Sequence, residues 1–203
     1  FSHTRAVAIK FWQQLKLEME TNTRLHQAFP EIFYSNPKKE SPRWSDERGL
    51  CVKRKTNPKE GTLEAWGLVD GQPTSKHFKI LLYDDIVVQS SVTTPEMIEK
   101  TLSQLENSYN LIRTNGGVKR FAGTRWHFSD AYATIIKRQT VNLRFHPGTE
   151  DGTETGKPVL WTEAQIKDLT FTLPTFAGTT EFARFNSQPK KIADAMHFFL
   201  LEN

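Results

Sequence analysis

The chain has 203 residues, of which 37% are hydrophobic and 25% charged, and its formal net charge is +4. These values are typical of a soluble globular domain and argue against a disordered chain, so we expect one α/β domain. Cys51 is the only cysteine, which excludes an internal disulfide and a cysteine zinc cluster. The sequence contains no apolar run of about 18 residues and no charged-then-apolar leader, so we expect a cytoplasmic protein without a membrane span or signal peptide.

The first third of the chain predicts a helix followed by two short strands. Residues 4–19 carry apolar side chains at the spacing of a helix with one buried stripe. Pro30 and Pro37 are expected to end this helical region. Residues 50–55 and 62–66 are β-prone and are separated by polar, proline and glycine residues, so they predict two strands of a hairpin-like excursion.

The middle of the chain contains the clearest strand and the clearest helix. Residues 77–88 hold a continuous apolar run, which is typical of a strand buried on both faces, and this run leads into Asp84 and Asp85. Residues 98–112 carry apolar side chains at steps of four, three, four and three, which predicts a helix. Residues 93–96 are suited to cap its start.

The rest of the chain continues the alternation of strands and helices. Residues 118–122 and 141–145 predict strands, and residues 130–137 predict a short helix between them. Thr162 and Gln165 fit a capping box for one more helix. Strands and helices that alternate with long connections predict a largely parallel sheet covered by helices.

Two polar motifs follow predicted strands at their carboxyl ends. Asp84 and Asp85 end one strand, and Gly123, Thr124 and Arg125 end the next strand along the chain. The carboxyl ends of parallel strands meet at one edge of a sheet. We therefore expect the two strands to lie side by side and parallel, with both motifs at this edge.

The aspartate pair predicts a metal site. Two adjacent carboxylates at the mouth of a buried strand are costly unless a cation compensates them, and Mg²⁺ is the expected cation. In a phosphate-cleaving ATPase, the first acid holds Mg²⁺ and the next one polarises the attacking water. An aspartate pair also fits a turn or a helix cap. The glycine, threonine and arginine also fit a tight strand-to-helix turn, in which Arg125 pairs with Asp130 on the surface.

Positive charge is concentrated between residues 113 and 144, where seven basic residues stand against a single acid. Such a stretch predicts a polyanion partner, with a solvated basic surface as the alternative. The candidate DNA contacts are Lys119, Arg120, Lys137 and Arg138. The six histidines show no pair at metal-ligand spacing, so we expect them to be packing or surface residues.

Residues 123–127 read Gly-Thr-Arg-Trp-His and are followed by Asp130 three positions further on. This string resembles a motif of bacteriophage terminase large subunits. The order of the other parts agrees with that family as well, and the resemblance covers nearly all 203 residues. The agreeing stretches are residues 2–8, 22–30, 43–45, 76–85 and 185–198. The aspartate pair and the Gly-Thr-Arg-Trp-His string are the most specific parts.

The resemblance implies a three-layer P-loop NTPase-like α/β domain and gives the motifs their roles. Asp84 would be the Walker B ligand of Mg²⁺, and Asp85 would be the catalytic carboxylate. Thr124 would belong to the coupling motif that senses the nucleotide, with Gly123 and Arg125 beside it in the same role. Asp85 stands where many relatives have a glutamate, which shortens its reach to the water.

The resemblance also implies what the intact protein does. It would be the ATPase motor that couples Mg²⁺-dependent hydrolysis of ATP to the translocation of double-stranded viral DNA into the procapsid. It would act as an oligomer in the cytoplasm of the bacterial host, together with the terminase small subunit and the portal protein.

Residues 1–203 would then be an ATPase domain separated from the rest of its protein. No stretch reads G-x-x-x-x-G-K-[ST], the loop whose amides and lysine hold the phosphates, so we expect this loop upstream of Phe1. Residues 152–157 end in Gly-Lys but follow the Walker B strand, and Pro158 replaces the hydroxyl residue. The nuclease domain of the family is expected after Asn203. The fragment by itself is therefore expected to be inactive.

Three other functions remain open. A helicase-like DNA-dependent ATPase would also place an acidic pair and a small hydroxyl residue on neighbouring strands, and it would continue into a second, similar domain. A non-enzymatic DNA-binding module would use the basic stretch, with the aspartates as caps. A metal-dependent nuclease would need further acids that converge on Asp84 and Asp85.

Overall fold

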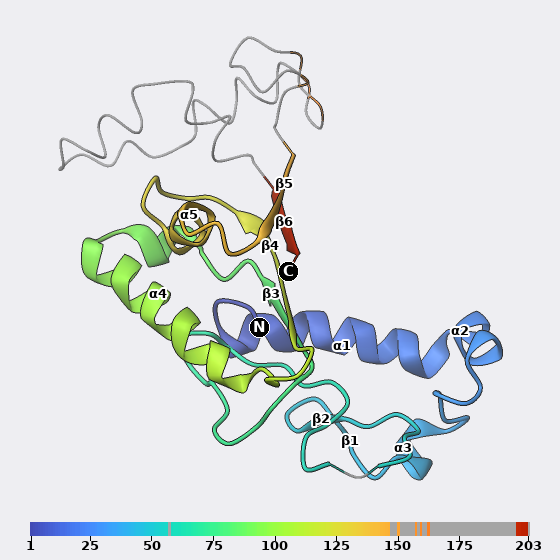
Figure 1. Cartoon of the computed structure of the whole chain (residues 1–203). Coiled ribbons are helices and arrows are strands. Elements are labelled where there is room, and N and C mark those ends of the chain that lie inside the picture. Colours follow the sequence, from blue (N-terminus) through green and yellow to red (C-terminus); the bar gives the residue numbers. More distant parts are fainter. Residues whose placement is uncertain are drawn as a thin grey trace. The chain divides into compact units, whose positions relative to one another are not determined.

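The computed structural model describes residues 1–56, 58–146, 150, 157, 159, 162 and 198–202. The chain is mixed α/β (Figure 1). It divides into two compact units. The first unit consists of Phe1–Ile86 and Glu99–Lys119, and the second of Val87–Ile98 and Arg120–Asn203. None of the helices that the structure describes is long and apolar enough to cross a membrane.

Helix α1 (Arg5–Thr21) confirms the helix predicted near the start of the chain. Ala8 and Trp12 form its buried side, with 7% and 5% exposure. Phe11 and Leu15 belong to the same predicted stripe but are exposed. The buried face of α1 is therefore narrower than the spacing of its apolar residues indicates.

Two short helices and a small hairpin follow α1. Helix α2 (Thr23–Ala28) ends before Pro30, as expected. Helix α3 (Pro37–Glu40) instead begins with a proline, because the fixed φ of proline suits the first turn of a helix. Strands β1 (Trp44–Ser45) and β2 (Gly49–Leu50) then pair antiparallel.

The strand pairing predicted for residues 50–55 and 62–66 is wrong. Leu50 belongs to β2 and keeps one antiparallel bridge to Leu63, with N to O distances of 3.1 and 3.3 Å. The chain reverses earlier than predicted, in the turn at residues 46–48, and Gly49 follows at the start of β2 with a φ of 81°, a conformation that favours glycine. β2 therefore pairs with β1. The later segment, residues 62–66, pairs with β2 through the bridge at Leu63 and does not form a continuous strand beside it.

A hydrophobic core joins α1 to the β1–β2 hairpin. Its buried members are Trp12, Leu50 and Val52. Partly buried apolar side chains pack against them: Met19, Ile32, Phe33, Trp44, Leu63 and Ala65. The side chains that meet here come from distant parts of the first unit, so this core ties α1 to the loops that follow it.

Strand β3 (Ile80–Asp84) carries the aspartate motif and pairs with the beginning of the chain. The backbone of Phe1 forms two hydrogen bonds with β3, of 2.6 and 2.8 Å. Ser2 continues this segment and forms a parallel bridge with Gly67. Strand β3 thus has a parallel neighbour that comes from the first residues of the chain.

Strand β4 (Val118–Thr124) carries the second motif and follows β3 in the order of the sheet. β3 and β4 form a small parallel sheet, in which Val118 N donates to Lys79 O at 2.8 Å. This confirms that the strands ending at the two motifs are parallel neighbours. β4 begins in the first unit and ends in the second.

In the described part of the chain, β3 is buried on one face and not on both as predicted. Leu81 and Tyr83 are buried, whereas Ile80 and Leu82 are 54% and 55% exposed. The buried face is covered by α4 (Pro95–Ser108), where the hydroxyls of Tyr83 and Ser108 lie 2.7 Å apart. A continuous apolar run does not distinguish a strand covered on both faces from one with an exposed apolar face.

Helices α4 and α5 confirm two further predictions. α4 covers most of the helix predicted over residues 98–112 and is followed by a 3-10 turn (Tyr109–Leu111). α5 (Ala131–Lys137) agrees with the helix predicted over residues 130–137. Of the helix predicted from Thr162 and Gln165, Thr162 is described, whereas Gln165 and the residues after it up to 197 fall outside the described residues.

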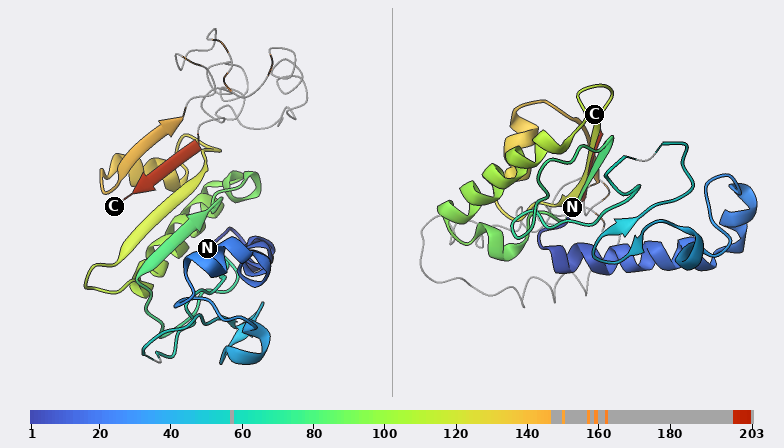
Figure 2. Two further views of the ribbon diagram at one scale, coloured as in Figure 1. Left: turned by 90° about the vertical axis from the view of Figure 1, so that its right-hand side faces the viewer. Right: turned by 90° about the horizontal axis from the view of Figure 1, so that it is seen from below.

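The second unit contains β5 (Asn142–His146) and β6 (Phe198–Glu202). β6 lies between β4 and β5 and runs antiparallel to both, in the order β3-β4-β6-β5 (Figure 2). The described sheet is therefore mixed and not largely parallel. β4 and β5 remain parallel to each other, as expected for strands joined by α5, and the antiparallel direction comes from a strand near the end of the chain.

Candidate functional site

The aspartate motif forms a turn at the end of β3. Asp84 is the last residue of the strand, and its backbone amide donates to Phe1 O at 2.8 Å. Asp85 follows with a φ of 43°, in the left-handed region, which is uncommon for residues with a side chain and is entered more readily by aspartate and asparagine than by most others. The next residue, Ile86, is fully buried. The exposed Asp85 is therefore turned out of the strand between two fixed neighbours.

The electrostatics of this turn oppose a second negative charge. Partial burial, and then the neighbouring Asp84 carboxylate, raise the pKa of Asp85 above its ordinary value. A divalent cation would offset both effects because it supplies the opposite charge. Mg²⁺ binds oxygen ligands, often one or two carboxylates with waters and phosphates, so the pair fits this ion. The described residues hold no group of three or more His, Cys, Asp or Glu that could enclose a metal.

Residues 1–3 form a strip beside the aspartate turn, which the sequence pattern did not identify. Ser2 is 2% exposed, and Leu68 N donates to Ser2 O at 2.9 Å. The ring of His3 lies 3.2 Å from Ile86 O through Nδ1, although the two residues are 83 positions apart. No spacing in the sequence signals this contact, because it depends on the pairing of distant segments.

A further carboxylate, Asp70, lies at the N-terminus of α1. Thr4 makes no side-chain cap there, and Asp70 Oδ1 instead accepts a hydrogen bond of 2.8 Å from Arg5 N. A negative charge is favourable at this end of a helix. Gly67 leaves room for the carboxylate, because a Cβ at this position would overlap Asp70 Oδ1. Asp70 therefore serves as the cap of α1.

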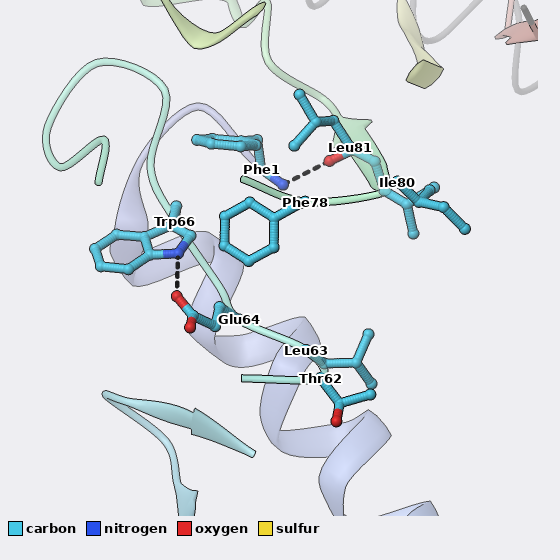
Figure 3. Close-up of a pocket in the computed structure, with 9 residues that line it drawn as sticks. Phe1, Thr62, Leu63, Glu64, Trp66, Phe78, Ile80 and Leu81 are labelled. Carbon is cyan, nitrogen blue, oxygen red and sulfur yellow. Dashed lines mark hydrogen bonds between the residues drawn. The ribbon is translucent and has the colours of Figure 1, made fainter. Parts of the chain in front are cut away.

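A shallow pocket of about 90 Å³ opens beside the exposed face of β3 (Figure 3). It is lined by Phe1, Thr62, Leu63, Glu64, Trp66, Phe78, Ile80, Leu81 and Leu82. The Glu64 carboxylate is 2% exposed and is satisfied by Lys76 Nζ at 2.5 Å and Trp66 Nε1 at 3.0 Å. Since the lining includes neither Asp84 nor Asp85, the pocket is separate from the aspartate turn.

In the second unit, Gly123 makes room for a buried tyrosine. Tyr132 of α5 is fully buried, and its hydroxyl donates to Ala122 O at 3.2 Å. A Cβ on Gly123 would overlap that hydroxyl. The glycine of the second motif is therefore explained by the packing of α5 on β4.

Asp130 organises the turn between β4 and α5. It is fully buried and caps α5, since one carboxylate oxygen accepts from Ala133 N at 2.9 Å. The other oxygen accepts from Trp126 N at 2.9 Å and from His127 N at 3.2 Å. A single carboxylate thus orders both the turn and the start of the helix.

Arg125 is held within the same turn. Its Nη2 donates to His127 O at 3.2 Å and to Phe128 O at 2.9 Å, and its Nε lies 3.8 Å from Asp130 Oδ1. The alternative in which Arg125 pairs with Asp130 is confirmed, with a fully buried carboxylate and a half-buried arginine instead of a pair on the surface. Thr124 is half-buried, and its hydroxyl has no hydrogen-bond partner among the described residues.

The candidate DNA contacts divide between the two units. Lys119 belongs to the first unit, where its Nζ lies 3.9 Å from the centre of the Tyr109 ring and burial lowers its pKa. Arg120, Lys137 and Arg138 belong to the second unit and are exposed. Exposed cations are suited to phosphate contacts, and the half-buried Lys119 contacts an aromatic ring.

The candidate residues are thus brought together in two groups. Asp84 and Asp85 lie with residues 1–3 in the first unit, and the Gly123–Arg125 motif lies with Asp130 in the second. That both motifs share one edge of the sheet stays a prediction. No family model, curated protein or solved structure matches this chain.

Proposed function

We propose that this chain is the ATPase part of a bacteriophage terminase large subunit, which acts in the cytoplasm of a bacterial host. In this proposal, a P-loop NTPase-like domain hydrolyses ATP with Mg²⁺ and moves double-stranded viral DNA into the procapsid. The observation that carries it is the turn after β3, where Asp85 leaves the strand at a φ of 43° directly after Asp84. Backbone strain of this kind is concentrated at active sites.

The two carboxylates of the turn have separate tasks. Bound Mg²⁺ would neutralise charge on the phosphates during phosphoryl transfer. Asp84 is suited to hold the ion, because its backbone is fixed against Phe1. Asp85 is exposed and projects from the turn, so it is suited to orient a water and accept its proton.

The second motif would couple the nucleotide state to movement. Thr124 has a hydroxyl without a partner among the described residues, so it is available to a ligand. Gly123 keeps Tyr132 of α5 packed on β4, and Arg125 with Asp130 locks the intervening turn. A shift at Thr124 would therefore move β4, the turn and α5 as one piece.

The partners follow from the charge of the second unit and from the resemblance. Arg120, Lys137 and Arg138 are exposed cations that would contact DNA phosphates. The terminase small subunit and the portal protein are the proposed protein partners, and the working motor would be an oligomer.

Steady-state phosphate release by the full-length protein tests the proposal. Asp84→Ala is expected to abolish Mg²⁺-dependent turnover, because it removes the metal ligand. Thr124→Ala is expected to keep hydrolysis while DNA translocation stops. Asp46→Ala is a matched control, because Asp46 pairs with Lys16 of α1 and has no role in the proposed site. Full turnover by Asp84→Ala would rule the proposal out.

A further inference from the structure

We infer that His3 is a positioning residue that holds the Asp84–Asp85 turn through a hydrogen bond from its Nδ1–H to Ile86 O. The catalytic consequence rests on the proposed function, whereas the hydrogen bond and its effect on the turn do not. From the sequence, His3 is expected to be a packing or surface residue, because no second histidine stands at metal-ligand spacing.

The partner atom determines the state of the imidazole. Ile86 O is a carbonyl oxygen, which accepts hydrogen bonds and does not donate them. The contact of 3.2 Å therefore places a hydrogen on Nδ1 of His3. In the neutral ring, Nε2 then carries the lone pair.

His3 completes a pair of restraints around the strained residue. Before Asp85, Asp84 N donates to Phe1 O at 2.8 Å. After Asp85, Ile86 O accepts from His3. These two bonds act on the backbone on each side of Asp85 and favour its left-handed conformation.

The strip that carries His3 is itself fixed. Ser2 is 2% exposed, and its carbonyl accepts from Leu68 N at 2.9 Å. The carbonyl of His3 accepts from Val69 N at 3.2 Å. The backbone that carries the imidazole is therefore held by hydrogen bonds from Leu68 and Val69, so the ring is a rigid support for the turn.

Loss of the His3 donor would release the turn. Ile86 is fully buried, so its carbonyl would be left without a partner in a place that water does not reach. Asp85 would lose one of its two restraints and relax from the left-handed region. Because a misplacement of about 1 Å lowers catalytic rates by up to about 100-fold, we expect kcat to fall while the KM for ATP changes little.

Two amide variants separate this role from general packing. In His3→Asn, the side-chain amide nitrogen takes the place of Nδ1 and keeps the donor to Ile86 O. In His3→Gln, the amide nitrogen takes the place of Nε2, so the donor to Ile86 O is lost. His26→Asn is the matched control, because the ring of His26 also contacts a backbone carbonyl, Met19 O at 2.7 Å, on another helix.

Nitrogen-15 NMR of the natural chain and the variants tests the inference without any activity. We expect the hydrogen of His3 on Nδ1, and we expect the amide signals of Asp85 and Ile86 to shift in His3→Gln but to stay in place in His3→Asn and His26→Asn. In the full-length protein, kcat is expected to fall about 10- to 100-fold in His3→Gln and less than about 3-fold in His3→Asn.

A neutral His3 ring that carries its hydrogen on Nε2 and not on Nδ1, or equal effects of His3→Asn and His3→Gln on the Asp85 signals, would overturn the inference. If His3→Gln does not fold, the position of the hydrogen in the natural chain still decides it. A full-length protein without ATPase activity, together with the expected NMR result, would refute the proposed function and leave the role of His3 intact.

Discussion

Asp85 carries two separate costs in the folded chain. Its φ of 43° is unfavourable for most residues other than glycine, and its carboxylate lies beside that of Asp84. Packing requires neither property, since the side chain is exposed and a glycine or an asparagine would relieve one or both costs. A residue that lowers the stability of the fold and has no packing role is expected to serve a function.

Replacement of Asp85 by glycine is expected to stabilise the fold. Glycine adopts a positive φ without the clash of a Cβ, so Asp85→Gly should raise the free energy of unfolding by roughly 0.5 to 1 kcal/mol. Asp85→Ala is the control, because it removes the charge but keeps the strain. Urea denaturation measures both variants, and an Asp85→Gly chain less stable than Asp85→Ala would contradict the strain at this position.

The raised pKa of Asp85 predicts a pH-dependent difference in stability. Because the folded pKa lies above the unfolded one, this side chain contributes stability below its unfolded pKa, and the contribution is lost as pH rises through the folded value. Asp85→Asn does not ionise. The urea midpoint of Asp85→Asn should therefore exceed that of the natural chain by an amount that increases between about pH 3 and pH 7. A gain that is constant over this range would show that the pKa is not raised.

At the scale of elements, the turn from β4 into α5 depends on the absence of a side chain at Gly123. Gly123→Ala is expected to lower the free energy of unfolding by about 2 kcal/mol, because the new methyl group overlaps the buried Tyr132 hydroxyl. The double variant Gly123→Ala with Tyr132→Phe removes the overlapping oxygen and should recover part of the loss. Thermal unfolding compares them, and an unchanged Gly123→Ala would refute the close packing.

Helices were predictable here because their signals are local. The start of α4 and the cap of α5 at Asp130 lie within a few residues of the helices that they begin. The pairing of Leu50 with Trp44 of β1 was not predictable. The segments around Trp44 and Leu63 are both β-prone, and the sequence does not indicate which of them pairs with Leu50. The exposed face of β3 was missed for a related reason, since coverage depends on what packs against a strand.

The candidate site was predictable in its polar residues and not in its supports. Asp84 and Asp85 stand out because acids at the end of an apolar run are unusual. His3 could not be identified, because its contact with Ile86 is made only after distant segments pair. The sequence allowed two roles for Arg125, nucleotide sensing or pairing with Asp130. The structure supports the pairing.

At the scale of the whole molecule, positive charge is the feature that points beyond the chain itself. Lys137 and Arg138 are exposed at the end of α5, in the basic stretch that predicts a polyanion partner. Phosphate contacts release counterions, so the affinity of such a surface for DNA falls as salt is raised.

Removal of these two charges should change the salt dependence of DNA binding. In Lys137→Ala with Arg138→Ala, the slope of log affinity against log salt should decrease by about 2 units, or about one for each lost phosphate contact. Lys38→Ala is the control, because Lys38 is exposed on α3 in the first unit. Fluorescence anisotropy with duplex DNA measures the slopes, and an affinity that does not fall with salt would refute the DNA contact.

The most direct test of the ATPase account is the steady-state kinetics of Asp85 variants in the full-length protein. Asp85→Asn keeps the size of the side chain and loses the base, so kcat for Mg²⁺-dependent phosphate release should fall by about 100-fold or more while the KM for ATP stays the same. Asp85→Glu, which keeps the carboxylate, should retain most of the turnover. An Asp85→Asn protein with undiminished kcat would contradict the account.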